Sequence, residues 1–298
     1  MSNQKISLIK KWFLATRPSS FLISTTPIVV GTSMAFGDGI AHFPTAFAAL
    51  LGAILIHIIT NLTNDYCDLK KGADKKGDFD PMRSILVGSI SQKEIKSAID
   101  VALLCLIPIC IYLISRAGWP IFVIAFLSLL SAIFYTAGKK PLGYQGFGDI
   151  LVLLFFGPIA VGGTYYAQTL EINAAVVLAG FGPGLLAMSI LAINNVRDFE
   201  TDKQVNKKTL VVRFGKTFGR IEYALSLTLA ALIPIIIYLT IHDHKIIIFS
   251  SVILLGAIFL IRRSFIIKNK PDFDQLIGLT VQLCLFYGII FSIGWIAR

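Results

Sequence analysis

Long apolar runs alternate with short polar segments along the whole chain. A helix that crosses a membrane needs about 20 mostly apolar residues, and nine runs approach that length. They cover residues 20–37, 43–63, 98–115, 119–137, 148–167, 174–194, 222–241, 246–262 and 276–296. The alternation typical of outer-membrane strands is missing from these runs. The pattern therefore predicts an all-α integral membrane protein with nine transmembrane helices.

Composition and charge support this interpretation and add an orientation. Hydrophobic residues make up 55% of the chain and charged residues 15%, whereas a soluble domain has about 25% charged residues. With nine spans, all but three of the 27 Lys and Arg residues fall on the side of the N-terminus; the exceptions are Arg116, Lys245 and Arg298. Because basic loops stay inside, we expect a cytoplasmic N-terminus and an outside C-terminus, in the inner (plasma) membrane. The net charge of +10 then needs no nucleic acid as partner.

Two acidic clusters follow apolar runs and fall on the same, cytoplasmic side of the predicted topology. The pattern N-x-x-x-D occurs in both, as Asn61 with Asp65 and as Asn194 with Asp198. A repeat of this kind is typical of membrane proteins whose related halves share one site between them. We therefore predict a single domain, 1–298, with two pseudo-related halves, 1–147 and 148–298.

The spacing within each cluster suits a metal site. If the helices continue into the loops, Asn61, Asp65 and Asp68 share one helix face. Carboxylate and amide oxygens favour Mg²⁺, and the clusters contain no Cys/His set that would favour zinc. Two such sites facing each other would hold one anionic group between them. The predicted Mg²⁺ ligands are Asn61, Asp65, Asp68, Asn194, Asp198 and Asp202.

Basic residues near the clusters suit phosphate oxygens, which bind metal ions together with Lys and Arg. These residues are Arg83 in DPMRSIL, Lys139 and Lys140 in a neighbouring inside loop, and Arg197 and Lys203 in the second cluster. A purely topological role is the alternative, since inside loops are basic in any case.

Two other protein classes also use acidic clusters in membranes. A divalent-cation transporter is one alternative, but transporter sites usually lie at the midplane, whereas these clusters lie at the ends of spans. A CDP-alcohol phosphotransferase would carry the signature DG-x-x-AR, which the chain lacks. A site that binds phosphate oxygens through Mg²⁺ is therefore the favoured hypothesis.

Three stretches resemble the UbiA superfamily of intramembrane aromatic prenyltransferases: NDYCDLKKGAD with a following RSIL, YTAGKKPLGYQGFGD, and NNVRDFETDKQVNKKTLVVRFG. The resemblance covers nearly the whole chain and is strongest to the MenA-type 1,4-dihydroxy-2-naphthoate prenyltransferases. It implies helices around a central cavity that opens to the cytoplasm. It also implies Mg²⁺ as cofactor, a polyprenyl diphosphate donor, an aromatic acid acceptor and demethylmenaquinone as product.

The resemblance also implies residue roles. The two Asn-led clusters would bind Mg²⁺ and, through it, the donor diphosphate, with Arg83 on a phosphate. Tyr135, Lys139 and Lys140 would lie near the diphosphate and the acceptor, and Asp149 in GFGD is a candidate general base. The adjacent lysines depart from the MenA-type pattern and resemble the hydroxybenzoate branch. The alternative acceptors are therefore 4-hydroxybenzoate and homogentisate.

Overall fold

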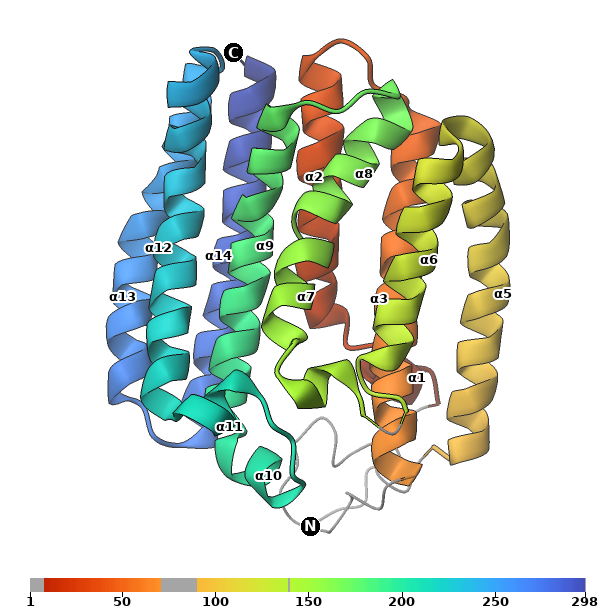
Figure 1. The fold of residues 1–298 in the computed structure, drawn as a ribbon, viewed down its shortest axis with the longest axis vertical. Helices are drawn as coiled ribbons and strands as arrows, with labels where there is room; N and C mark the ends of the chain where they lie inside the picture. The colour runs from red at the N-terminus through yellow and green to blue at the C-terminus, as the bar shows by residue number, and fades with distance from the viewer. Residues whose placement is uncertain (1–7, 71–89, 139, 298) are drawn as a thin grey trace.

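The computed structural model describes residues 8–70, 90–138 and 140–297, and these residues form helices and their connections without a β-strand (Figure 1). The α-helices are α1 (Leu8–Ala15), α2 (Phe21–Gly37), α3 (Phe43–Lys70), α5 (Gln92–Ala117), α6 (Trp119–Phe134), α7 (Gly148–Phe155), α8 (Pro158–Thr169), α9 (Ala174–Arg197), α10 (Phe199–Gln204), α11 (Leu210–Phe214), α12 (Lys216–Ile241), α13 (Ile253–Ile266) and α14 (Lys270–Ala297). Three 3₁₀ turns join them: η1 (Pro18–Ser20), η2 (Leu142–Gln145) and η3 (Lys245–Val252).

Eight helical segments of the described residues are long and apolar enough to cross a membrane. The shorter apolar helix α6 lies where a ninth span was predicted. Its 16 residues reach about 24 Å, less than the roughly 30 Å hydrocarbon core of a bilayer. The all-helical membrane class is therefore confirmed, and the number of nine stays a prediction.

Several helices extend beyond their apolar runs into polar sequence. Helix α5 begins at Gln92, ahead of the run at 98–115, because Ser91 and Glu94 form a capping box there. The Ser91 amide donates to Glu94 Oε2 at 2.7 Å, and the Glu94 amide donates to Ser91 Oγ at 3.2 Å. Helix α3 likewise continues to Lys70, past the run that ends at 63. The first acidic cluster is thus helical, as predicted.

The predicted span 148–167 corresponds to one candidate membrane crossing, Gly148–Thr169, but it consists of two helices, because the helix is interrupted between α7 and α8 (Figure 1). Pro158 has no amide hydrogen to continue the ladder. A Cβ at Gly157 would lie 2.3 Å from Leu153 O and 2.8 Å from Gly180 O. Only glycine therefore allows the broken segment to lie this close to α9.

The helices from the two ends of the chain lie together. Helix α2 packs against α8, α9 and α14, and α9 packs against α12 (Figure 1). The largest fully buried side chains here include Tyr223, Tyr287 and Phe291. Gly182 of α9 makes room for Tyr287, whose hydroxyl oxygen would lie 2.0 Å from a Cβ at that position. The core thus fixes α9, which carries the second acidic cluster, against the last helix of the chain.

We expect Gly180→Ala to destabilise the protein, because the new Cβ would lie 2.5 Å from the Cα of Pro158. Overpacking of this kind costs about 1–3 kcal/mol. The matched control is Gly278→Ala, where nothing lies within 4 Å of the new Cβ. The measurement is the fraction of detergent-solubilised protein that stays monodisperse after heating. Equal thermal stability of the two variants would contradict the close packing of α8 on α9.

Candidate functional site

A cavity of about 430 Å³ lies among α2, α3, α5, α6, α7, α8 and α9. Most of its wall is apolar, but polar side chains gather where α3, α6 and α9 reach their C-terminal ends. These are Arg17, Ser20, His57, Asn61, Asn64, Tyr135 and Asn194. The cavity therefore suits a ligand with a long apolar part and a polar head.

Two asparagines of α3 tie the polar end to neighbouring segments. Asn61 Nδ2 donates to the carbonyl of Thr16 at 3.2 Å, just after α1. Asn64 Oδ1 accepts from Thr136 Oγ1 at 2.7 Å, just after α6. Both asparagines line the cavity, so Asn61 is the member of the predicted helix face that reaches it, whereas Asp65 is not part of the cavity wall. Sequence analysis identified Asn61 but not Asn64.

Asp65 is held by an arginine that sequence analysis did not single out. Arg17 Nη2 lies 2.6 Å from Asp65 Oδ1, and the Asp65 side chain is 12% exposed. Arg17 follows α1 with a left-handed φ of 53° and lines the cavity itself. Asp68 belongs to α3, but its side chain lies outside the described residues. The only indication of this role in the sequence was the position of Arg17 as a single basic residue between α1 and α2.

The second cluster departs from the predicted continuous helix. Helix α9 ends at Arg197, and Asp198 connects it to α10 with φ −95° and ψ 10°. The backbone bonds from Asp198 N to Asn194 O (2.9 Å) and from Asp202 N to Asp198 O (2.8 Å) still keep helical spacing. Asn194 lines the cavity opposite α3. The two asparagines that begin the clusters therefore share one cavity wall.

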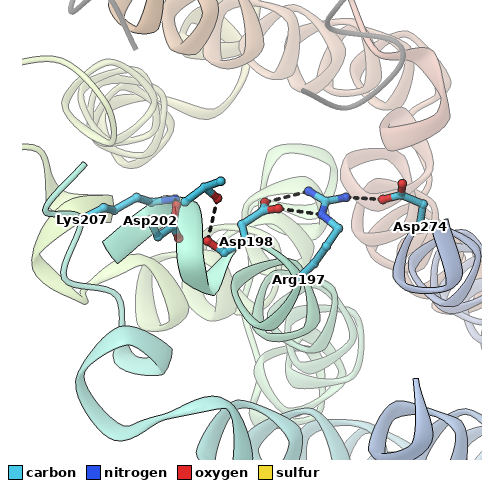
Figure 2. A network of polar contacts seen from close by, with 6 residues as sticks. Arg197, Asp198, Asp202, Lys207 and Asp274 are labelled. Carbon is cyan, nitrogen blue, oxygen red and sulfur yellow. Dashed lines mark hydrogen bonds and ion pairs between the residues drawn. The ribbon is translucent and has the colours of Figure 1, made fainter. Parts of the chain in front are cut away.

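Arg197 binds two carboxylates from different helices (Figure 2). Its Nε and Nη2 donate to the two oxygens of Asp198 at 2.9 and 2.8 Å. Its Nη1 donates to Asp274 Oδ1 at 2.6 Å. Asp274 lies in the first turns of α14, 77 residues away in the chain. Sequence analysis placed Arg197 at the site but did not identify Asp274.

Asp202 is buried in α10 and paired with a lysine (Figure 2). Lys207 Nζ lies 3.1 Å from Asp202 Oδ1, and Oδ2 has no hydrogen-bond partner among the described residues. Burial raises the pKa of Asp202 above its usual range, and the charge of Lys207 opposes that rise. The carboxylate thus depends on Lys207 to stay ionised.

The connection after α6 wraps around Tyr135. The amide of Gly143 donates to Tyr135 O at 3.0 Å, and a Cβ at Gly143 would lie 2.9 Å from the tyrosine ring. Tyr135 lines the cavity. Lys140 and Lys203, in contrast, are exposed and are not part of the cavity wall. Lys139 and Arg83 lie outside the described residues.

Asp149, the predicted general base, is 3% exposed and is not part of the cavity wall. Its carboxyl group lies close to that of Glu222 on α12, but Asp149 Oδ1 and both carboxyl oxygens of Glu222 have no hydrogen-bond partner among the described residues. Two carboxyl groups placed this close repel each other when both are ionised. Glu222 was missed by sequence analysis, although a lone glutamate at the start of an apolar run was a visible signal.

His57 lines the cavity one turn before Asn61. Its Nε2 lies 2.8 Å from Ser20 Oγ, and that hydroxyl donates to the carbonyl of Arg17 at 2.7 Å. Because the hydroxyl has one hydrogen, both contacts are hydrogen bonds when Nε2 carries the imidazole proton. Nδ1 is then an acceptor, and it has no partner among the described residues.

The donor set fits a hard cation, though the described side chains do not form a complete site. No three carboxylate, His or Cys side chains among them are placed to hold a metal ion. Oxygen donors nevertheless dominate, and each described carboxylate of the clusters is paired with a cation: Asp65 with Arg17, Asp198 with Arg197, and Asp202 with Lys207. These cations supply the positive charge that a bound metal would supply.

Comparisons with known proteins define the class. The model of the UbiA prenyltransferase family matches residues 24–277. The chain is 34% identical to the 1,4-dihydroxy-2-naphthoate octaprenyltransferase of Escherichia coli K12, over 99% of this chain and 97% of that protein. It is 38% identical to the protein of that name from Haemophilus influenzae, over 78% of this chain and 77% of the relative. The chain therefore belongs to the UbiA prenyltransferase family.

Solved structures show the same fold. A UbiA homologue from Archaeoglobus fulgidus, bound to GPP and Mg²⁺, matches with a TM-score of 0.66 at 18% identity, over 95% of this chain and 99% of that one. The apo structure of a homologue from Aeropyrum pernix K1 matches with a TM-score of 0.65 at 12% identity, over 90% and 97% of the two chains.

We expect Lys207→Met to leave the buried carboxylate of Asp202 unpaired. At pH values above the pKa of Asp202, the free energy of unfolding should then fall by about 2–4 kcal/mol. Since burial raises the pKa of that carboxyl group, protonation on acidification stabilises the folded state more than the unfolded state. The deficit is therefore present at neutral pH and shrinks as the pH falls through the raised pKa.

The measurement is thermal unfolding in detergent at several pH values between about 5 and 8. Lys203→Met is the matched control, because Lys203 is an exposed lysine of α10, the helix that also contains Asp202. A deficit that is the same at every pH, or that also occurs in the control, would contradict the role assigned to the ion pair.

Proposed function

We propose that this protein transfers a polyprenyl group from a polyprenyl diphosphate to 1,4-dihydroxy-2-naphthoate, with loss of diphosphate and CO₂, giving the quinol form of demethylmenaquinone. The observation that carries the proposal is that Asn61 and Asn194, which begin the two acidic clusters, line the same polar end of one apolar cavity. The names of the Escherichia coli and Haemophilus influenzae relatives support the acceptor.

The donor fits the cavity in two parts. The isoprenoid chain occupies the apolar part, and the diphosphate lies at the polar end. Mg²⁺ would neutralise the diphosphate so that it can leave, and the homologue bound to GPP and Mg²⁺ supports this role. The residues that would hold the ion are Asp65, Asp68, Asp198 and Asp202, with Asn61 and Asn194.

Cationic side chains complete the diphosphate site. Arg17 already lies in the cavity wall, and Arg197 is beside the second cluster. The remaining proposed contacts to diphosphate or to the acceptor carboxylate are Arg83, Lys139, Lys140 and Lys203. A guanidinium fork matches phosphate oxygens better than a point charge does, so the arginines are assigned to the diphosphate.

The reaction breaks the C–O bond between the prenyl chain and the diphosphate and forms a C–C bond to the aromatic ring. Aromatic rings of the wall, among them Tyr135, Phe155 and Phe156, stabilise the allylic cation between these events. The apolar wall keeps water away from that cation. The acceptor carboxyl group leaves as CO₂, so that the product retains an aromatic diol. For the acceptor hydroxyl, His57 is better placed than the buried Asp149, since His57 lines the cavity.

One feature favours other aromatic acids as acceptors. Lys139 and Lys140 follow Tyr135 closely in the sequence, and this basic pair resembles the hydroxybenzoate branch of the family, so 4-hydroxybenzoate and homogentisate are the alternative acceptors. These acceptors keep the reaction and change only the ring. Divalent-cation transport, the other alternative, receives no support from the family, whose described function is prenyl transfer.

We also propose a topology for this enzyme. The chain crosses the inner (plasma) membrane nine times, with the N-terminus in the cytoplasm, the C-terminus outside and the active site open to the cytoplasm. The distribution of basic residues supports this arrangement, and α6 supplies the ninth crossing.

The activity test uses membranes with radiolabelled farnesyl diphosphate and a panel of phenolic acids. We expect prenylation of 1,4-dihydroxy-2-naphthoate, loss of activity with EDTA, and recovery with Mg²⁺. Asp65→Asn, Asp198→Asn and Asp202→Asn should each lower kcat about 100-fold or more. EDTA-resistant activity would contradict the metal assignment, and preferential prenylation of another phenolic acid would reassign the acceptor.

The topology test places single cysteines on a background without the four native ones. We expect a membrane-impermeant maleimide applied to intact spheroplasts to label Arg298→Cys but not Ser2→Cys or Lys203→Cys, since Lys203 is an exposed residue of α10. Opening the membranes should make all three reactive. Labelling of Ser2→Cys and Arg298→Cys from the same side would contradict an odd number of crossings.

A further inference from the structure

The guanidinium nitrogens of Arg197 form hydrogen bonds to two different carboxylates. The fork formed by Nε and Nη2 faces both oxygens of Asp198, at 2.9 and 2.8 Å. The third nitrogen, Nη1, reaches Asp274 Oδ1 at 2.6 Å (Figure 2). The Arg197 side chain is 19% exposed, against 34% for Asp198 and 39% for Asp274. The guanidinium is thus the most buried member of a three-residue ion network.

This arrangement conflicts with metal binding by Asp198. Both carboxylate oxygens already accept hydrogen bonds from one guanidinium, and a cation bound there would repel Arg197 at short range. A metal ion that binds the lone pairs now facing Arg197 therefore requires the fork of Arg197 to leave Asp198. A largely buried guanidinium without any anionic partner is unfavourable, so the departure needs a second carboxylate.

Resting on the proposed function, we propose that Asp274 is a positioning residue: it retains Arg197 when the fork leaves Asp198, and so turns that fork toward the diphosphate. A guanidinium fork binds carboxylate and phosphate oxygens with the same two parallel hydrogen bonds. The metal ion and the diphosphate thereby exchange partners with the Asp198–Arg197 pair, and no charge is left uncompensated.

The placement of Asp274 suits this role. Its neighbour Phe273 is buried in the core, and the backbone amide of Phe273 donates to the carbonyl of Asn269 at 3.3 Å. The start of α14 is therefore anchored, and Asp274 stays in reach of Arg197 through both states. Asp272 lies in the same helical turn but forms no ion pair with Arg197, whose described partners are Asp198 and Asp274.

The test measures Mn²⁺ binding to the full-length protein in detergent by electron paramagnetic resonance, first alone and then with inorganic diphosphate. Asp274→Asn should weaken Mn²⁺ binding about three- to tenfold, as expected for partly exposed ion pairs in a network. Asp272→Asn removes the same charge two residues away and should leave binding unchanged.

Arg197→Ala separates the two roles of the arginine. Without the competing fork, this variant should bind Mn²⁺ alone at least as tightly as the wild type, and it should bind diphosphate more weakly. In the Arg197→Ala background, Asp274→Asn should have no further effect, because Asp274 acts through Arg197.

The inference is overturned if Asp274→Asn and Asp272→Asn weaken Mn²⁺ binding equally, if neither does, or if the effect of Asp274→Asn persists in the Arg197→Ala background. The assay contains neither a prenyl chain nor an aromatic acceptor, so a wrong acceptor assignment leaves its outcome unaffected. A wild-type protein that binds no Mn²⁺ with or without diphosphate would overturn both the inference and the proposed metal site.

Discussion

Carboxylates at the ends of apolar helices must be neutralised, and much of the site follows from this constraint. An unpaired charge near a bilayer core is costly, and the motif carboxylates described have cationic partners: Arg17, Arg197 and Lys207. These partners come from the end of α1, the end of α9 and the segment after α10. These carboxylates are therefore charge-compensated before any ligand arrives, and under the proposed function a ligand binds by exchanging partners with existing ion pairs.

The local sequence pattern was sufficient to predict the residues of each acidic cluster, but it did not predict which residues form ion pairs with them. Helical spacing correctly predicted that Asn61 and the carboxylates after it continue α3. Arg17 and Asp274 were not predicted, because they reach their partners across 48 and 77 residues of sequence. Periodicity reports which face a residue occupies, whereas tertiary packing decides what lies opposite that face. Asp149 illustrates the limit, since its position at the start of a span suggested the cavity but packing placed it against Glu222.

Hydropathy predicted where the membrane helices lie but not whether each is continuous. The run 148–167 is apolar throughout, yet it contains the break between α7 and α8. The dipeptide Gly157–Pro158 was a readable signal for that break. The break at Asp198 had no comparable signal, because the FETDKQ that follows it is a reasonable helical sequence and contains no Gly or Pro. Hydropathy is averaged over a window of residues, so it does not report a helix interruption at a single residue.

The position of α2 has a consequence for how the protein is made. Its packing partners α8, α9 and α14 are synthesised more than a hundred residues after it. Until they emerge, the small and polar side chains of α2, such as Ser24, Thr26 and Ser33, have lipid or the insertion machinery as neighbours. Contacts between distant segments slow folding, and here α14 completes the packing around α2. The cavity wall, whose lining residues end at Asn194 of α9, is therefore synthesised before the packing around α2 is complete.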